Sequence, residues 1–339
     1  MVKVAINGFG RIGRLFFRQA FGEKNINIVA VNDLGSVENL AYLLKHDSVY
    51  GTFEKSVKVQ GKNLVVGGKK IECLRVKEPR KLPWKKMGVD IVVEATGVFD
   101  SFAMSKDHLK AGAKRVVITA PTDDADGKDG ATVLMGVNDG KLKSIKLSSN
   151  ASCTTNAASP VIAILSEKLG IEKAMLSTVH GYTASQALVD GPVRGHDLRR
   201  GRAAAYNIVP STTGAAEAVE RALPGLAGKF DGIAFRVPVI AGSIADITLV
   251  SKRNTSVKEV NTILKKAAGS SRWKGIMAVT EDPVVSSDIV GQPYGAIVDL
   301  PLTRVVGGNL VKVLSWYDNE YGYASTLVKH VNRAGKYLK

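Results

Sequence analysis

The first fourteen residues, Met1 to Arg14, read MVKVAINGFGRIGR and decide the fold. Val2 to Ile6 is a short apolar run that predicts a buried strand. The segment Asn7 to Gly13 follows it directly with the spacing G-x-G-x-x-G and leads into the helical pattern of Arg14 to Phe21. A strand, a glycine loop and a helix in this order predict a dinucleotide-binding unit with a doubly wound, mostly parallel sheet.

Each glycine of the loop has its own role in this interpretation. Gly8 permits a tight turn, Gly10 lets a pyrophosphate approach the backbone, and Gly13 lets helix and strand pack closely. A second strand-like run, Ile26 to Val31, ends just before Asp33, at the spacing expected of a ligand for the adenosine ribose hydroxyls. A carboxylate there repels a ribose phosphate, so Asp33 favours NAD over NADP. The alternative is an aspartate in a turn or helix cap.

Two further apolar strands are expected at Asp90 to Glu94 and at Arg115 to Thr119, and each is followed by small residues. The carboxyl ends of parallel strands are where a doubly wound sheet admits its ligand, so Thr96, Gly97 and Thr119 are candidate cofactor-binding residues. Ordinary strand-to-helix turns are the competing explanation.

Bulk composition sets the class of protein. At 339 residues, two domains are expected, and 45% hydrophobic with 23% charged residues is typical of a globular chain. The net charge of +16 suits nucleic acid but equally small polyanions such as phosphorylated metabolites. Two distant cysteines, no leader peptide and no membrane-length apolar run predict a cytoplasmic protein without a disulfide framework. We expect no metal site.

The stretch Ser148 to Pro160, SSNASCTTNAASP, holds the candidate nucleophile. Cys153 precedes the helical pattern of Ala157 to Leu169, so it lies at an expected helix start, where backbone N–H groups and the helix dipole favour a thiolate. The same N–H groups can stabilise an oxyanion. A small buried cysteine beside a helix cap is the alternative.

The chain then changes to longer strand-like runs, which predict a second domain. His180 lies near the far end of the run Ala174 to Tyr182. A cysteine nucleophile needs a base of this kind, although a lone histidine on a strand is more often structural. Arg236 is the single charge in the apolar run Ile233 to Val239, so it needs an anionic partner and is a candidate phosphate ligand.

A long segment between these runs, Thr183 to Ile208, is rich in positive charge. Its basic residues bind phosphate or form a solvated surface; they are Arg194, His196, Arg199, Arg200 and Arg202. The hydroxyl-rich Ser211 to Gly214 is then predicted to open a helix that extends through Arg221, a second anion-binding helix start.

The C-terminal segment predicts how the domains are divided. A helix is expected at Ala324 to Asn332, and we expect it to pack on the first domain. The nucleotide-binding domain would then comprise residues 1–151 and 317–339, and the second domain residues 152–316. The expected fold class is α/β, with a Rossmann-type domain followed by an α+β domain with a mainly antiparallel sheet.

The chain resembles the phosphorylating glyceraldehyde-3-phosphate dehydrogenases along essentially its whole length. The motifs that carry the resemblance are NGFGRIGR, Asn32-Asp33, SNASCTTN, HGYTASQ, DLRRGRAAA, STTGAA, AFRVPV and SWYDNEYGY, in that order. The resemblance implies a homotetrameric enzyme of glycolysis that oxidises D-glyceraldehyde 3-phosphate with NAD and inorganic phosphate to 1,3-bisphosphoglycerate. It also implies that Cys153 forms a thiohemiacetal and then a thioester, and that His180 lowers its pKa and accepts the proton.

The resemblance further implies roles for residues in the matching motifs. Substrate and phosphate would be bound by Ser152, Thr154, Thr183, Arg199, Thr213, Gly214 and Arg236. NAD would be bound at the pyrophosphate by Arg11 and Ile12, at the nicotinamide carboxamide by Asn319 and in the nicotinamide pocket by Tyr323.

The chain departs from the family pattern at two places. Ala157 replaces a second cysteine that many members carry, and Gly191 to His196 differs from the usual loop. Two other functions remain open: an erythrose-4-phosphate dehydrogenase, which releases its acyl group to water, and a nucleic-acid-binding protein that uses the positive surface. Neither a membrane nor nucleic acid is required by the main interpretation.

Overall fold

The computed structural model describes residues 1–193 and 197–338. The chain forms two compact units. The first comprises Met1–Met135, Asp139–Ala151 and the chain from Leu327 onward, and the second comprises Gly136–Asn138 and Ser152–Thr326. The positions Arg194 and His196, which the sequence analysis included among the basic residues, lie outside the described residues.

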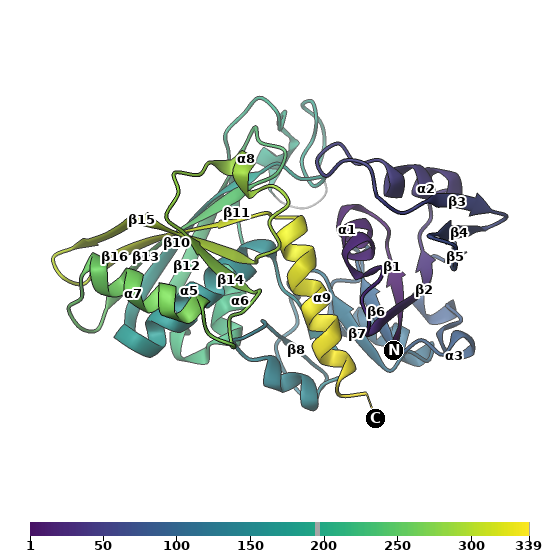
Figure 1. Cartoon of the computed structure of the whole chain (residues 1–339), viewed down its shortest axis with the longest axis horizontal. Coiled ribbons are helices and arrows are strands. Elements are labelled where there is room, and N and C mark those ends of the chain that lie inside the picture. Colours follow the sequence, from purple (N-terminus) through teal and green to yellow (C-terminus); the bar gives the residue numbers. More distant parts are fainter. Residues whose placement is uncertain (194–196, 339) are drawn as a thin grey trace. The chain divides into compact units, whose positions relative to one another are not determined.

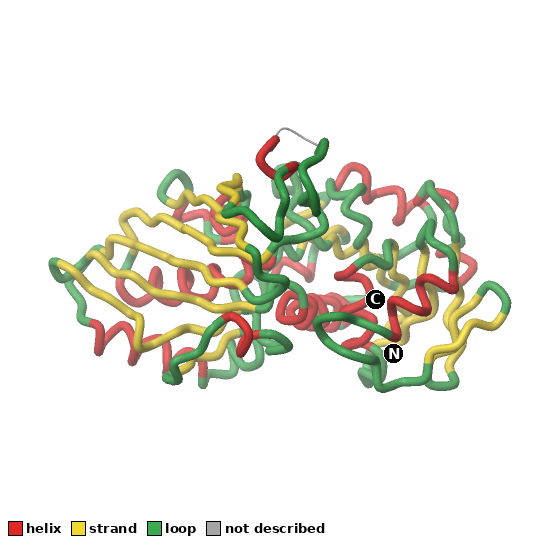
Figure 2. The backbone as a smooth tube through the Cα atoms, turned by 90° about the horizontal axis from the view of Figure 1, so that it is seen from above, coloured by secondary structure: helices red, strands yellow, loops and turns green. Residues whose placement is uncertain are grey.

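The first unit is built on a mostly parallel sheet, as the glycine-loop motif predicts (Figure 1). The strand order is β3-β4-β5-β2-β1-β6-β7-β9-β8. The pairs from β5 through β8 are parallel, and β3, β4 and β5 form antiparallel hairpins at one edge (Figure 2). The strands are β1 Val2–Asn7, β2 Ile26–Asn32, β3 Val57–Gln60, β4 Asn63–Val66, β5 Lys69–Leu74, β6 Ile91–Glu94, β7 Arg115–Ile118, β8 Gly130–Thr132 and β9 Leu147–Ser149.

Helices of the first unit alternate with these strands, which gives the doubly wound α/β architecture. They are α1 Arg11–Ala20, α2 Val37–Lys45, α3 Trp84–Met87 and α4 Phe102–Lys110, with 3₁₀ turns at Pro79–Lys81 and Asp139–Lys143. Strand β1 shows why the core forms: Val4 and Ile6 face one cluster and Ala5 faces another, so both faces of the strand are buried. A continuous apolar run is typical of such a strand.

The second unit contains a mainly antiparallel sheet with the order β11-β12-β10-β13-β16-β15-β14. Only β10 with β12 and β14 with β15 pair in parallel. The strands are β10 Ile171–Gly181, β11 Val209–Thr212, β12 Phe230–Val237, β13 Ser243–Ser251, β14 Met277–Thr280, β15 Ala296–Val306 and β16 Leu310–Tyr317. The fold class expected from the sequence is confirmed.

Helices pack against this second sheet, with α5 against β13, β15 and β16, and α7 against β14 and β15 (Figure 1). Helix α6 packs against α5 and β12, and α8 is a single turn. The elements are α5 Cys153–Leu169, α6 Ala215–Ala222, α7 Val257–Ala268 and α8 Ser286–Ile289, with 3₁₀ turns at Leu198–Gly201 and Pro224–Leu226.

The last helix, α9 Tyr321–Gly335, begins in the second unit and ends in the first. Leu327, Val331 and Ala334 are buried in the same hydrophobic cluster as Val4 and Ile6 of β1. The C-terminal part of the helix therefore completes the core of the nucleotide-binding unit.

The structure differs from the sequence expectation at the hydroxyl-rich Ser211–Gly214. Ser211 and Thr212 end strand β11 and pair with β12, and Gly214 is the N-cap of α6. The β-branched Thr212 satisfies its backbone groups in the sheet, so only Thr213 and Gly214 stand at the helix start. Strand β14 was not predicted from the sequence.

Candidate active site

The cysteine predicted as nucleophile is the first residue of α5. Ser152 caps the helix, because its Oγ accepts the backbone N–H of Thr155 at 3.0 Å. The hydroxyl thereby satisfies one of the N–H groups that every helix start leaves without a partner. The apolar run after Cys153 predicted the rest of this helix, and most residues of that run are buried.

The second unit brings this cysteine to the predicted base. Cys153 Sγ lies 3.3 Å from Nε2 of His180, which is near the end of β10. His180 is itself paired with Arg236 across the parallel strands β10 and β12. Two residues 27 apart in sequence are therefore in contact through the tertiary fold, at a distance suited to proton transfer.

Burial sets the charge state of this pair. Burial and then the Arg236 charge lower the pKa of His180 to about 3. Burial also raises the pKa of Cys153, against the opposing effects of Arg236 and of the helix N–H groups. The sequence led us to expect a lowered thiol pKa, but desolvation outweighs the helix start. Both shifts favour an uncharged thiol beside an uncharged imidazole, which can take up the proton as the sulfur attacks.

Nδ1 of His180 has two competing partners. It lies 2.6 Å from the carbonyl oxygen of Gly181 and 2.7 Å from Nη1 of Arg236. The carbonyl only accepts, so it requires a proton on Nδ1, whereas the guanidinium only donates and requires a bare Nδ1. Nε2 can accept the thiol proton only in the first state. The Arg236 contact therefore opposes the basic form of the ring.

Arg236 has the features of an anion ligand. Its Nε is buried and has no hydrogen-bond partner among the described residues, and burial lowers its pKa. A buried guanidinium with an unused donor is costly unless a ligand pairs with it.

One residue beside the site, Tyr317, was missed by sequence reasoning. Tyr317, at the end of β16, is hydrogen-bonded through its hydroxyl to Thr154 and Thr178, each at 2.7 Å. Its ring meets His180 edge-on, with centroids 5.9 Å apart, and burial raises its pKa. Tyr317 belongs to the motif SWYDNEYGY, but no local pattern in that motif points to a contact with α5 or β10.

Arginines of the basic segment occupy different environments. Arg199 is exposed, whereas its neighbour Arg200 contacts Asp197 and the hydroxyl groups of Ser185 and Ser211. The Arg200 charge also contributes to lowering the pKa values of His180 and Arg236. Among the arginines of this segment within the described residues, Arg200 is therefore the one whose charge affects His180 and Arg236. The family resemblance had implied its neighbour Arg199 instead.

The other predicted phosphate ligands lie on loops and helix starts of the same unit. The Thr183 hydroxyl is 2.9 Å from Ser185 Oγ, two residues beyond the end of β10. Thr213 Oγ1 accepts the backbone N–H of Ala215 at 3.2 Å, beside the N-cap Gly214.

The glycine loop of the first unit has the geometry that a dinucleotide requires. A Cβ at Gly8 would lie 2.5 Å from the backbone of Ala95, and one at Gly13 would lie 2.2 Å from the Gly8 oxygen. At Gly10, the N-cap of α1, a Cβ would meet no atom within 4 Å, and no side chain caps the helix. Gly8 and Gly13 thus serve packing, whereas Gly10 borders open space at a helix start that can receive a phosphate.

The predicted partners of the loop surround it. Asp33 Oδ2 accepts the N–H of Phe9 at 2.7 Å, so this carboxylate is held against the glycine loop. The Arg11 side chain forms an ion pair with Asp47 at 2.5 Å. Arg11 and Ile12 are therefore expected to meet a pyrophosphate through their backbone N–H groups at the start of α1.

The remaining cofactor candidates are divided between the two units. Thr96 and Gly97 follow β6, and Gly97 has φ +64°. Thr119 follows β7, and its backbone N–H donates to the backbone carbonyl oxygen of Glu94 at 3.0 Å. Asn319 and Tyr323 belong to the second unit. Asn319 Oδ1 accepts from Gly242 N and Ser243 Oγ, which leaves its NH₂ group to donate to a ligand carbonyl.

These observations define a class of protein. One unit offers a glycine-loop dinucleotide site, and the other offers a histidine in contact with both a cysteine and a partly buried arginine. Together they define a nicotinamide-dependent dehydrogenase that works through a cysteine.

Comparisons with known proteins give the family. The family model described as "Glyceraldehyde 3-phosphate dehydrogenase, NAD binding domain" matches residues 2–102, and the one described as the C-terminal domain matches residues 152–319. A glyceraldehyde-3-phosphate dehydrogenase of Mycobacterium avium is 48% identical over 345 residues, covering 99% of each chain. One of Borreliella burgdorferi is 47% identical, covering 96% of this chain and 98% of its own. The chain belongs to the glyceraldehyde-3-phosphate dehydrogenase family, and its cofactor is NAD.

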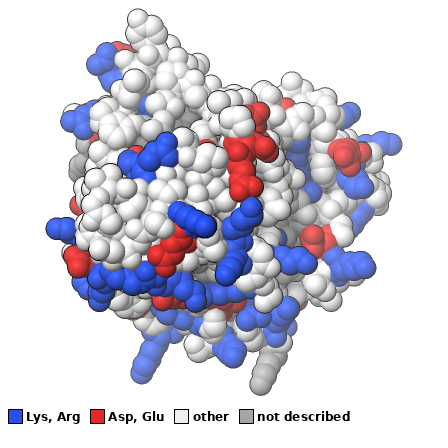
Figure 3. Space-filling model, turned by 60° about the vertical axis from the view of Figure 1, so that its left-hand side comes forward, with Lys and Arg blue, Asp and Glu red and all other residues white. Residues whose placement is uncertain are grey.

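The last two features are the surface distribution of charged side chains and the hydropathy of the helices. Figure 3 shows lysine and arginine side chains spread over one face of the molecule, with acidic residues and uncharged surface between them. Within the described residues, no helix is both long and apolar enough to span a membrane.

Proposed function

We propose that the chain oxidises D-glyceraldehyde 3-phosphate reversibly, with NAD and inorganic phosphate, to 1,3-bisphosphoglycerate, as a step of glycolysis. The observation that carries this proposal is the 3.3 Å contact between Cys153 Sγ and His180 Nε2 at the start of α5. Membership of the family supports it.

The chemistry begins at the sulfur. Cys153 attacks the aldehyde carbon as its proton passes to His180 Nε2, and His180 returns that proton to the former carbonyl oxygen, so that a thiohemiacetal forms on the enzyme. His180 Nε2 accepts the hydroxyl proton again as the hydride leaves. A bound NAD would supply the oxidation as the hydride acceptor. The acyl group is then a thioester on Cys153, and inorganic phosphate attacks it to release the acyl phosphate and restore the sulfur. Excluding water conserves the energy of the thioester.

The substrate phosphate assists the base in this proposal. An anion that binds Arg236 draws the guanidinium away from Nδ1 of His180, so the ring can donate from Nδ1 to the Gly181 oxygen and accept at Nε2. Thr183, Arg199 and Arg200 complete the proposed binding set for the substrate phosphate. Ser152, Thr154, Thr213 and Gly214 are the proposed set for inorganic phosphate.

An alkylation experiment tests the role of Arg236. The pH profile of Cys153 alkylation by neutral iodoacetamide is measured with and without saturating inorganic sulfate. Release of His180 predicts a lower apparent pKa of alkylation with sulfate. Simple neutralisation of Arg236 predicts a higher one, because Arg236 lowers the thiol pKa. A higher value would refute the proposed release.

Assembly and domain organisation follow from the same family. We expect a cytoplasmic homotetramer, with residues 1–151 and 317–339 as the NAD-binding domain and 152–316 as the catalytic domain, although residues 317–326 group with the second compact unit. Exposed apolar side chains on the second sheet support association with other copies; they include Met175, Val179, Ile233, Leu302 and Leu310.

One assay distinguishes the candidate reactions. NADH formation is measured with glyceraldehyde 3-phosphate and with erythrose 4-phosphate, each with and without inorganic phosphate. The proposal expects rapid, phosphate-dependent turnover of the three-carbon aldehyde. Preference for erythrose 4-phosphate without a need for phosphate would instead identify the alternative enzyme.

A further inference from the structure

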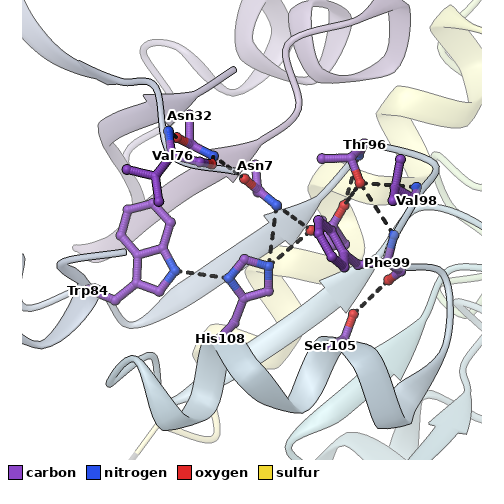
Figure 4. A network of polar contacts seen from close by, with 10 residues as sticks. Asn7, Asn32, Val76, Trp84, Thr96, Val98, Phe99, Ser105 and His108 are labelled. Atoms are coloured by element: carbon purple, nitrogen blue, oxygen red, sulfur yellow. Dashed lines mark hydrogen bonds and ion pairs between the residues drawn. The ribbon is translucent and has the colours of Figure 1, made fainter. Parts of the chain in front are cut away.

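A buried polar network lies beneath the cofactor loops of the first unit, and the mechanism above does not use it (Figure 4). Its centre is Glu94, the last residue of β6, which is only 2% exposed. His108 on α4 is 0% exposed and is 2.9 Å from the Glu94 carboxylate. Two buried titratable groups in contact require a reason, since burial of such groups is costly.

The Glu94 carboxylate is held by donors on both oxygens. Oε2 accepts from Asn7 Nδ2 at 2.6 Å and from His108 Nε2 at 2.9 Å. Oε1 accepts from the backbone N–H of Thr96 at 2.8 Å and from the Thr96 hydroxyl. The carboxylate therefore has a single orientation in which all its partners are satisfied.

Trp84 determines which nitrogen of His108 carries the proton. Its indole Nε1 is 2.9 Å from His108 Nδ1. Because an indole N–H can only donate, Nδ1 must accept, and Nε2 must donate to Glu94. Asn7 Nδ2 also lies 3.4 Å from Nε2, but both are then donors to the same carboxylate oxygen. Trp84, His108 and Glu94 thus form a chain with one direction of hydrogen bonding.

The network reaches three segments of the cofactor site. Asn32, Asn7 and Glu94 are direct neighbours across strands β2, β1 and β6. Asn32 Nδ2 donates to Asn7 Oδ1 at 2.7 Å. Asn7 immediately precedes Gly8, and Asn32 immediately precedes Asp33. Glu94 bonds Thr96, which lies two residues further along the chain.

The Thr96 side chain also fixes the turn that follows β6. Its Oγ1 accepts the backbone N–H groups of Val98 at 3.1 Å and Phe99 at 3.5 Å (Figure 4). The turn after β6 is therefore built on a hydroxyl that Glu94 holds in place.

We propose that Glu94, His108 and Trp84 are positioning residues for NAD, which hold the glycine loop, the Asp33 segment and the Thr96 loop in their binding arrangement before the cofactor arrives. The inference rests on the cofactor-binding assignments made above. Order present before binding does not have to be created by the ligand, so the network raises affinity for NAD. None of the three residues needs to touch the cofactor.

The test compares variants of His108 in direct binding of NAD, measured by titration without aldehyde or phosphate. His108→Leu removes both hydrogen bonds and should raise the Kd for NAD by about 10-fold or more, the effect of losing about 1.4 kcal/mol. His108→Gln, which can donate to Glu94 and accept from Trp84, should stay within about 3-fold of the wild type. Trp84→Phe removes the indole donor and part of the buried ring volume but keeps His108, and it is the second variant if His108→Leu does not fold.

Leu64→Ala is the matched control, because it destabilises the core of the same unit from β4, which lies outside the network. It should lower the melting temperature without a comparable change in Kd. In all variants the KM for the aldehyde should change much less than the KM for NAD.

The proposal would be overturned if Leu64→Ala raised the Kd for NAD as much, for a given loss of stability, as the network variants do. An unchanged Kd in both His108→Leu and Trp84→Phe would also overturn it. Because the titration contains no substrate, a wild-type protein that binds NAD but fails to oxidise the aldehyde would refute the proposed reaction and leave this inference standing.

Discussion

Two helices, α1 in the first unit and α5 in the second, begin at the proposed pyrophosphate site and at the proposed nucleophile, and they begin differently. At α1 no side chain caps the helix, and the N-cap Gly10 borders open space. At α5 Ser152 caps the helix, and Cys153 is partly buried against His180. Both ends carry the same helix dipole. The open end is suited to a bound anion, whereas the capped end presents a side chain whose chemistry is decided by its neighbours.

Replacing the reactive group at α5 gives the largest expected effect. Cys153→Ser should reduce NADH formation by about 10³-fold or more, because a serine hydroxyl does not ionise as a thiol does. NAD binding, measured by titration, should be retained. Turnover near the wild-type rate would remove Cys153 from the role of nucleophile and with it the contrast between the two helix starts.

Two glycines of the α1 loop separate ligand binding from packing. Gly13→Ala places a Cβ 2.2 Å from the Gly8 oxygen and should cost about 1–3 kcal/mol of stability. Gly10→Ala meets no protein atom, so stability should change by less than about 0.5 kcal/mol while the Kd for NAD rises. Denaturant unfolding and NAD titration measure the two effects. Unchanged NAD affinity in Gly10→Ala would show that the open helix start is not the pyrophosphate site.

Buried histidines make both units sensitive to acid. Burial lowers the pKa of His330 to about 3, where it lies between Ser148 and Asn150. The folded state keeps the ring uncharged while the unfolded chain takes up a proton below about 6.5, so stability is lost as pH falls. Between pH 7 and pH 5 this one residue should cost about 2 kcal/mol. His330→Gln should reduce the pH dependence of unfolding by that amount, and an identical pH dependence would contradict the assignment.

The cap of α5 gives the smallest effect. Ser152→Ala leaves the Thr155 N–H without its partner and should lower stability by about 1 kcal/mol. Since Ser152 is also proposed to bind inorganic phosphate, the KM for phosphate should rise more than the KM for the aldehyde. Equal changes in both constants would assign the residue to the helix cap alone.

Local sequence patterns predicted the parts of the site that depend on short-range geometry. The glycine spacing predicted the loop, because a turn that needs Gly8 at φ +92° and a helix that packs on Gly13 both follow from a few consecutive residues. The start of α5 at Cys153 followed from one cap and an apolar period. Arg236 was predicted because a lone charge in an apolar strand requires a partner.

The patterns could not reveal contacts made between distant segments. Tyr317 reaches Thr154 and Thr178 from a strand more than 130 residues away, and Arg200 rather than its neighbour Arg199 directs its charge toward His180. No sequence pattern marks His108 or Trp84 as more than a helix residue. Their contacts with each other and with Glu94 of β6 arise only from the packing of α3 and α4.

The sequence by itself predicted the two-part architecture, the glycine loop proposed to bind NAD and the choice of Cys153 as candidate nucleophile, because backbone geometry, helix capping and apolar period are local properties of the chain. The tertiary structure alone decided the charge state of that cysteine and of its histidine, since burial and the Arg236 charge arise only when β10, β12 and α5 pack together. A pKa depends on solvent and on charges in space, and sequence order specifies neither.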